Sequence, residues 1–177
     1  MQSIILDRDG VINLDSDAYV KSSEEWIPIA GSLEAISRLQ AAGYTVCVAT
    51  NQSGLGRGLF KMADLEAMHA KFSDLLIQAG GQSVDIAYCP HAPDDQCDCR
   101  KPKPGLLKQL AERHQLDLHN TIVVGDSLRD LEAAQAVGAD AILVLTGKGT
   151  RTQQQHPNLP FPIFADLAHV AEHLLRP

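Results

Sequence analysis

The sequence lacks a long apolar run, a basic excess and any repeated or low-complexity segment, and each absence narrows the class of protein. No stretch of the 177 residues is apolar enough to cross a bilayer. The first ten residues, MQSIILDRDG, are too short and too acidic for a signal peptide, so we expect a cytoplasmic protein. With 15 basic against 22 acidic residues, the net charge of -7 argues against general binding to nucleic acid or anionic membranes. A small anionic substrate is not excluded, because a basic pocket can lie on an acidic protein.

The chain also lacks a second compact segment large enough for a cap domain. Its length suits one domain, residues 1–177, with a well-buried core. We therefore expect an open site whose specificity comes from short inserts, in a monomeric protein. The four cysteines of a cytoplasmic chain are interpreted as thiols or metal ligands, not as a disulfide framework.

Apolar runs alternate with helical patterns along the whole chain. Continuous apolar strands separated by helices predict an α/β fold, a doubly wound and mainly parallel sheet covered on both faces. Segment 150–162, rich in Gln and Pro, is interpreted as a surface connection. Two inserts, 13–29 and 89–103, interrupt the alternation of strands and helices. Because both follow predicted strands, we expect them at the carboxyl edge of the sheet, where such sheets bind ligands. The expected strands are 3–6, 45–50, 84–88, 121–124 and 141–145, and the expected helices are 32–42, 62–79, 104–114, 128–137 and 167–175.

Polar side chains follow three of the predicted strands. Asp7 and Asp9 end the first strand, Thr50 ends the second, and Asp126 follows the fourth with Asp130 one turn later. Each group alone also fits an ordinary turn, and Asp130 also fits a carboxylate placed to favour a helix dipole. Together they would bring several carboxylates to one edge, where they repel one another unless a cation lies among them. Oxygen ligands of this kind favour Mg²⁺.

The second insert carries three cysteines and a histidine within eleven residues, in the pattern C-x-H-x5-C-x-C. Three thiolates and one imidazole form a complete tetrahedral zinc set, which predicts a structural site with no open position. The simpler interpretation is a reactive or incidental cysteine cluster. Zinc would give this insert the order that it cannot obtain from a core of its own, and would fix the cations that follow it, Arg100 and Lys101. The expected ligands are Cys89, His91, Cys97 and Cys99.

These motifs, in this order and spacing, resemble those of the haloacid-dehalogenase phosphatase superfamily: D-x-D-G-V at Asp7, T-N at Thr50, K-P at Lys101 and G-D-x-x-x-D at Gly125. The resemblance implies that Asp7 attacks phosphorus and forms an aspartyl-phosphate. Asp9 would protonate the leaving oxygen and then activate water, a role that predicts a raised Asp9 pKa. The resemblance also implies that Thr50 and Lys101 bind phosphoryl oxygens. The implied Mg²⁺ ligands are the Asp7 carboxylate, the Asp9 backbone carbonyl and Asp126.

The run C-P-H-x5-C-D-C-R-K-P resembles a branch of that superfamily that acts on heptose 1,7-bisphosphate or on histidinol phosphate. The first insert, with I-N before an acidic turn and Y-V, is similar to the heptose enzymes. The resemblance therefore implies removal of the C7 phosphate of D-glycero-D-manno-heptose 1,7-bisphosphate. Histidinol-phosphate phosphatase is one alternative, and a zinc-stabilised phosphate-binding module without turnover is another. Some relatives carry Lys where this chain has Ser127. The implied substrate contacts are Asp15, Ser16, Asp17, Ala18, Tyr19, Thr50, Asn51, Gln52, Ser53, Arg100 and Lys101.

Overall fold

A computed structural model describes residues 2–176 of the chain. In this range, six parallel strands form one sheet in the order β3-β2-β1-β4-β5-β6. The central strand, β1, is flanked by β2 and β4, so the direction of winding reverses beside it, where sheets of this kind bind ligands. The predicted fold class is confirmed. The strands are β1 (Ser3–Leu6), β2 (Thr45–Asn51), β3 (Asp85–Cys89), β4 (Thr121–Gly125), β5 (Asp140–Val144) and β6 (Ile163–Phe164).

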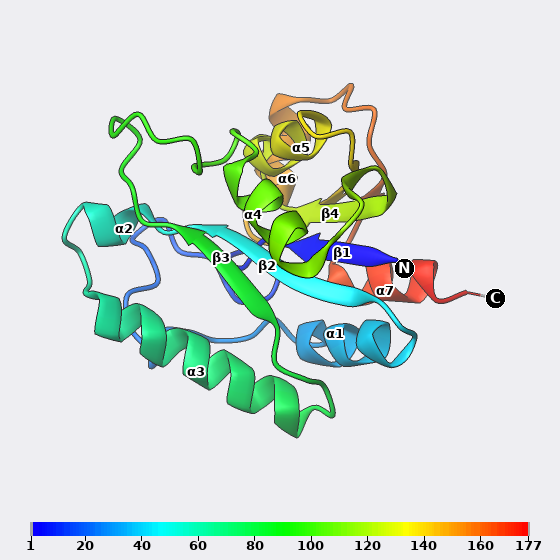
Figure 1. The fold of residues 1–177 in the computed structure, drawn as a ribbon, viewed down its shortest axis with the longest axis horizontal. Helices are drawn as coiled ribbons and strands as arrows, with labels where there is room; N and C mark the ends of the chain where they lie inside the picture. The colour runs from blue at the N-terminus through cyan, green and yellow to red at the C-terminus, as the bar shows by residue number, and fades with distance from the viewer. Residues whose placement is uncertain (1, 177) are drawn as a thin grey trace.

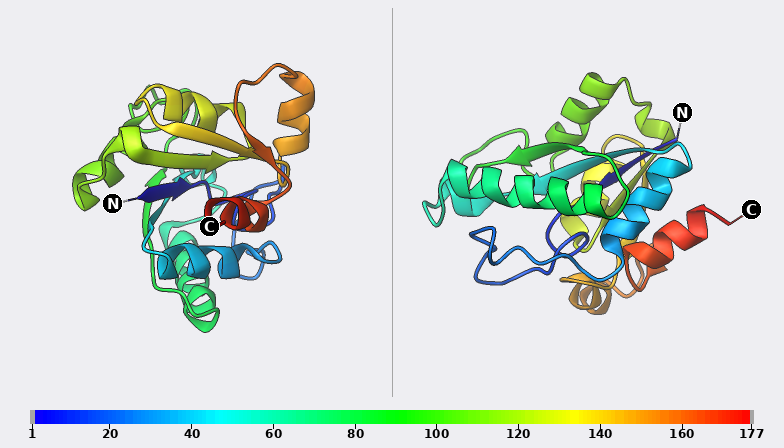
Figure 2. Two further views of the ribbon diagram at one scale, coloured as in Figure 1. Left: turned by 90° about the vertical axis from the view of Figure 1, so that its right-hand side faces the viewer. Right: turned by 90° about the horizontal axis from the view of Figure 1, so that it is seen from below.

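Helices cover both faces of the sheet (Figure 1). On one face lie α1 (Ser32–Ala41), α3 (Met62–Gln78) and α7 (Leu167–Leu174), which lie in front of the sheet when the molecule is seen from below (Figure 2). On the other lie α4 (Gly105–His114) and α5 (Leu128–Gln135). Alternate residues of β1 enter the two cores: Ile4 and Leu6 pack with α1 and α3, while Ile5 packs with α4 and α5. Burial on both faces explains why these strands are continuously apolar.

Four short elements were not predicted, and one of them corrects an expectation. Segment 150–162 is not simply a surface connection, because it begins within α6 (Gly149–Gln155). Its Gln-rich sequence lacks apolar periodicity, and Thr152 anchors the helix by donating a hydrogen bond to the Asp126 backbone carbonyl at 2.9 Å. The 2-residue β6 pairs with β5. The remaining elements are α2 (Ser53–Gly56) and a 3₁₀ turn, η1 (Leu118–Asn120).

The first insert has no helix or strand of its own, yet it is tied to α3. Trp26 is fully buried, and its ring centroid lies 5.5 Å from that of Phe72. The Lys71 ammonium donates hydrogen bonds to the carbonyls of Ser23 and Trp26 at 2.7 and 2.8 Å. These contacts give the insert a fixed position beside the carboxyl edge of the sheet. No helix among the described residues is long and apolar enough to span a membrane.

Candidate active site

Three carboxylates from two strand ends gather at the carboxyl edge. The Asp7, Asp126 and Asp130 side chains each offer an oxygen, and these oxygens lie within 4.8 Å of one another, close enough to hold one cation. The Asp126 carboxylate is enclosed by backbone, because a Cβ on Gly10 or Gly147 would collide with its Oδ2. Both glycines have a positive φ, 87° and 56°. Glycine is therefore required at each position both because a Cβ would clash and because other residues rarely adopt this backbone conformation.

Crowding changes the acidity of this carboxylate group. Burial, the neighbouring Asp130 charge and Asp9 raise the Asp7 pKa to about 7, although Lys101 opposes the shift. Burial and the charges of Asp7 and Asp130 raise the Asp126 pKa to about 8. Like charges held this close favour protonation unless a cation neutralises them. The donor set, all oxygen and partly enclosed, fits Mg²⁺.

Lys101 is buried among acceptors at the base of the site. Its ammonium lies 2.9 Å from Asp7 Oδ1, 2.6 Å from Asp130 Oδ1 and 2.7 Å from the Ala49 carbonyl. Asn51 holds its backbone from both sides: its Oδ1 accepts from the Lys101 N–H at 3.0 Å, and its Nδ2 donates to the Lys101 carbonyl at 3.1 Å. Burial opposes ionisation, but the two carboxylates outweigh it and raise the lysine pKa. Lys101 is therefore a fixed cation beside Asp7.

Asp9 has a different environment from the other carboxylates. The Arg8 guanidinium donates to both of its oxygens, at 2.9 and 3.1 Å from Nη2, and the side-chain amides of Asn13 and Gln52 donate at 2.8 and 2.9 Å. Burial favours the neutral acid, but Arg8 and these hydrogen bonds prevail and lower the Asp9 pKa. The expectation of a raised pKa was wrong, because it did not include the fully buried Arg8. Arg8 in turn lies 3.2 Å from His69 Nε2.

By its sequence position Asp130 fits either a helix cap or a site residue, and the structure places it in both positions. Its Oδ2 accepts from the Ser127 N–H and hydroxyl at 3.1 and 2.8 Å, which caps α5. Its Oδ1 pairs with Lys101 at 2.6 Å. The helix cap therefore orients a carboxylate toward the cation cluster.

These groups border a cavity of about 340 Å³, a size within the range of small-molecule binding sites. Two of the expected contact residues do not line it. Thr50 is 1% exposed, with its hydroxyl accepting a hydrogen bond from Gln52 at 2.9 Å, and Ala18 is exposed on the insert. The expected residues that do line the cavity are Asp7, Asp9, Asp15, Ser16, Asp17, Tyr19, Asn51, Gln52, Ser53, Arg100, Lys101 and Asp126.

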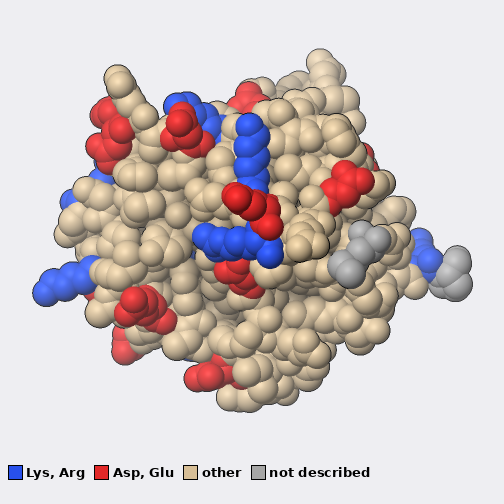
Figure 3. Space-filling view, in the orientation of Figure 1, with Lys and Arg blue, Asp and Glu red and all other residues tan. Residues whose placement is uncertain are grey.

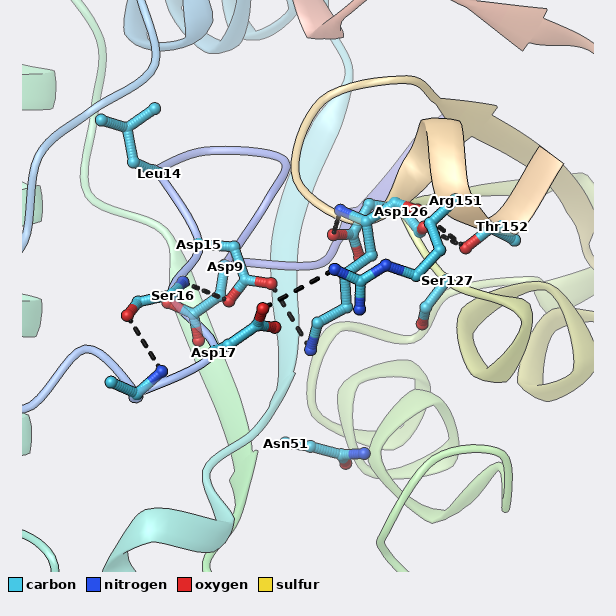
Figure 4. A network of polar contacts seen from close by, with 12 residues as sticks. Asp9, Leu14, Asp15, Ser16, Asp17, Asn51, Asp126, Ser127, Arg151 and Thr152 are labelled. Carbon is cyan, nitrogen blue, oxygen red and sulfur yellow. Dashed lines mark hydrogen bonds and ion pairs between the residues drawn. The ribbon is translucent and has the colours of Figure 1, made fainter. Parts of the chain in front are cut away.

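Several cavity residues had no sequence signal of their own. Lys148, after β5, donates its N–H to Asp126 Oδ2 at 2.8 Å, and its ammonium lies 3.4 Å from Asp15. Asp17 points across the site toward Arg151, 3.6 Å away, whereas Leu14 points away from this network (Figure 4). Two ion pairs thus connect the first insert to the β5–α6 segment. The other cavity residues that were missed are Val20, Arg57, Pro93 and Arg129.

The second insert gathers its four predicted zinc ligands. Cys89 Sγ lies 3.6 Å from Cys97 Sγ and 3.5 Å from His91 Nδ1, and that nitrogen lies 3.3 Å from Cys99 Sγ. Tetrahedral zinc with its usual bond lengths requires ligand separations of about 3.5 to 3.8 Å, so the arrangement fits the metal. Burial and the neighbouring Cys99 thiol raise the Cys89 pKa to about 12. Burial also acts to raise the Cys97 pKa, but hydrogen bonds from the Arg100 N–H and the adjacent thiols outweigh it and lower this pKa to about 6. A bound cation would favour the thiolate form of all three.

Comparison with known proteins places the chain in a family. The HAD-hydrolase-like family model matches residues 98–170. The D-glycero-beta-D-manno-heptose-1,7-bisphosphate 7-phosphatase of Pseudomonas putida is 56% identical over 175 residues, which cover 99% of this chain and all of the relative. The chain belongs to this phosphatase family. The enzyme of the same name from Neisseria meningitidis serogroup A is 55% identical over 88% of this chain and 83% of its own length.

A solved structure of this phosphatase family has the same fold. The crystal structure of D,D-heptose 1,7-bisphosphate phosphatase from B. bronchiseptica, complexed with magnesium and phosphate, superposes with a TM-score of 0.95. It is 54% identical and covers 99% of this chain and 98% of its own. The family model begins after Asp7 and Asp9, whereas the full-length relatives extend across both. As a member of this family, the chain is a phosphatase.

Proposed function

We propose that this chain hydrolyses the 7-phosphate of D-glycero-β-D-manno-heptose 1,7-bisphosphate in the synthesis of nucleotide-activated heptose for the lipopolysaccharide core. The observation that carries the proposal is the Asp7, Asp126 and Asp130 cluster with Lys101 at the base of a sugar-sized cavity. Relatives with this activity in their names align along nearly the whole chain, at 55 to 56% identity. The β anomer is taken from those names.

In this proposal Asp7 is the nucleophile. Its carboxylate would attack phosphorus to form an aspartyl-phosphate, and Lys101, 2.9 Å away, would offset the negative charge of the phosphoryl oxygens. The Thr50 hydroxyl, which accepts a hydrogen bond from Gln52, would reorient and donate a hydrogen bond to the same oxygens. Covalent catalysis divides one difficult displacement into two easier steps.

Asp9 would transfer the proton in both steps. Its lowered pKa suits the second step, in which an ionised carboxylate takes a proton from water. In the first step it must donate a proton to the leaving oxygen. A phosphate dianion bound beside Asp9 would raise its pKa and so allow it to carry that proton. Arg8, Asn13 and Gln52 would keep the carboxyl group in position throughout.

Two metals complete the proposal. Mg²⁺ would be held by Asp7, the Asp9 backbone carbonyl and Asp126, and would supply charge neutralisation for the phosphoryl group. The relative from B. bronchiseptica was solved with magnesium and phosphate, which supports this choice of ion. Zinc on Cys89, His91, Cys97 and Cys99 would be structural, because four protein ligands leave no open position.

Replacing Asp7 with Asn tests the nucleophile. We expect kcat for heptose bisphosphate to fall about a thousand-fold or more, because an amide cannot form the acyl phosphate. Phosphate release in the presence of Mg²⁺ is the measurement, and Asp74→Asn, an exposed carboxylate away from the site, is the matched control. Retained activity in Asp7→Asn would contradict the assignment, and an inactive wild type would favour a binding module.

The substrate is tested by comparing kcat/KM for heptose 1,7-bisphosphate with that for histidinol phosphate. We expect a preference of at least about a hundred-fold for the bisphosphate, since a second charged group contributes a few kcal/mol of binding. A preference for histidinol phosphate would overturn the proposed substrate.

We also infer that the chain works as one domain, as a monomer in the cytoplasm, with a small phosphorylated sugar as its partner and without nucleic acid or membrane. The single sheet supports the inference of one domain.

A further inference from the structure

Three arginines line the active-site cavity together with the carboxylates. Arg100 follows the last cysteine of the second insert, Arg57 follows α2, and Arg129 lies in the first turn of α5. They come from three separate segments of the chain, so their presence in one cavity is a product of the tertiary structure. They are also close in electrostatic terms, because Arg129 and Arg57 both lower the Arg100 pKa, in addition to the effect of burial.

These arginines lack the carboxylate partners that the other basic residues of the site have. Lys101 pairs with Asp7 and Asp130, and Lys148 pairs with Asp15. Among residues 2–176, the side chains of Arg57, Arg100 and Arg129 form no ion pair and no side-chain hydrogen bond. Nη1 of Arg100 is sealed from solvent without a hydrogen-bond partner. Neighbouring guanidinium groups that repel one another, one of them partly desolvated, are stabilised by an anion between them.

Arg129 is also in an unfavourable local position. It is the second residue of α5, where the partial positive charge of the helix N-terminus disfavours a cation. Ser127, the N-cap of this helix, is uncharged. Arg129 is half-buried, opposes the helix dipole and has no acidic partner. Its charge is therefore better explained by the binding of an anionic ligand than by stability.

We propose that Arg57 and Arg129 join Arg100 in binding the phosphate group that is not hydrolysed, and that Arg129 sets the preference for a bisphosphate over a monophosphate. The inference rests on the proposed function and adds two specificity-determining residues to it. The carboxylates and Lys101 would hold the reacting phosphate at the base of the cavity. The three guanidinium groups would bind the second phosphate of the same sugar, with the bidentate geometry that suits phosphate oxygens.

The test is a comparison of two substrates, heptose 1,7-bisphosphate and heptose 7-phosphate, for the wild type and for Arg129→Gln. We expect the ratio of their kcat/KM values to fall about 10- to 100-fold in the variant, mainly through KM of the bisphosphate. Arg129→Lys should recover part of this ratio, because it keeps the charge but loses the planar fork. Arg57→Gln should lower the ratio too, and because Arg57 is exposed this variant does not depend on the packing of α5.

Arg38→Gln on α1 is the matched control, since it removes one exposed positive charge outside the cavity, and its ratio should equal that of the wild type. Equal losses on both substrates in Arg129→Gln would overturn the proposal, because they would indicate a disturbance of the adjacent Asp130. An unchanged ratio in both variants would overturn it while leaving the proposed function intact. A wild type without any preference for the bisphosphate would overturn both.

Discussion

The carboxylates of the site differ in their partners, and the partners decide what each group can do. Asp7 is largely shielded from solvent and Asp126 is buried, both near other acids, which raises their pKa values to about 7 and about 8. Asp9 lies only two residues after Asp7 in the sequence. Its pKa is nevertheless lowered, by Arg8, Asn13 and Gln52. Environments that separate the pKa values of neighbouring acids are a common way to assign different roles to them.

Mg²⁺ binding is expected to depend on pH because of Asp7 and Asp126. Below their pKa values both groups carry protons that the metal must displace, so the affinity for Mg²⁺ should rise roughly 100- to 1000-fold from pH 6 to pH 8 and then level off. Calorimetry in buffers of different ionisation enthalpy would measure the affinity and the protons released. An affinity independent of pH would contradict the prediction.

The raised pKa values of Asp7 and Asp126 also determine how the stability of the metal-free protein changes with pH. The folded pKa values lie above the unfolded value of about 4, so the folded state binds more protons between pH 4 and pH 8. Metal-free protein should therefore lose stability as pH rises through this window. Mg²⁺ should raise Tm more at pH 8 than at pH 6, and Asp126→Asn should remove much of this difference, whereas Asp74→Asn should not.

At the scale of elements, the second insert presents Lys101 to the site although it has little regular structure. Cys89, the last residue of β3, begins the cysteine cluster, and Asn51, the last residue of β2, holds the Lys101 backbone. Two adjacent strand ends thus fix the two ends of one insert. A metal between them would supply the order that a small apolar core cannot.

Replacing Cys97 with Ser tests the structural role of this cluster. The wild type should contain about one zinc per chain, and the variant should lose it together with stability, because zinc binding stabilises the folded insert. Elemental analysis and thermal unfolding are the measurements. Cys47→Ala is the control, since this cysteine is buried in β2 outside the cluster, and it should keep its zinc. Fully folded wild-type protein without zinc would refute the prediction.

At the scale of the molecule, one sheet with helices on both faces supports the site at its carboxyl edge (Figures 1 and 2). On the face in Figure 3, basic and acidic side chains lie beside one another, without an extended basic patch. Mixed charge of this kind is compatible with an anionic substrate that enters a small pocket.

The protein should sediment as a monomer. Its calculated mass is 19.1 kDa, and the site described above is built from residues of one chain. Sedimentation equilibrium over a range of concentrations should give this mass throughout. A stable mass twice as large would contradict the prediction.

Much of the architecture could be predicted because it depends on local patterns. β1 and β2 were recognised as apolar runs, and α1 and α3 from helical spacing before glycine. In contrast, α6 was missed because its Gln-rich sequence has no apolar periodicity, and a tertiary hydrogen bond from Thr152 to Asp126 holds it. Boundaries elsewhere differ by one or two residues, as expected where helix ends fray.

The sequence by itself determined which chemistry meets at the carboxyl edge, because parallel strands that end in Asp7, Thr50 and Asp126 must deliver these residues to the same side of the sheet. It also determined the cysteine cluster, whose members lie close together in the chain. Only the tertiary structure decided the remote partners: Asp9 with Gln52, Asp130 with Lys101, and Arg57 and Arg129 beside Arg100. The physical reason is that pKa values and ion pairs depend on distances between segments remote in sequence, which strand patterns do not specify.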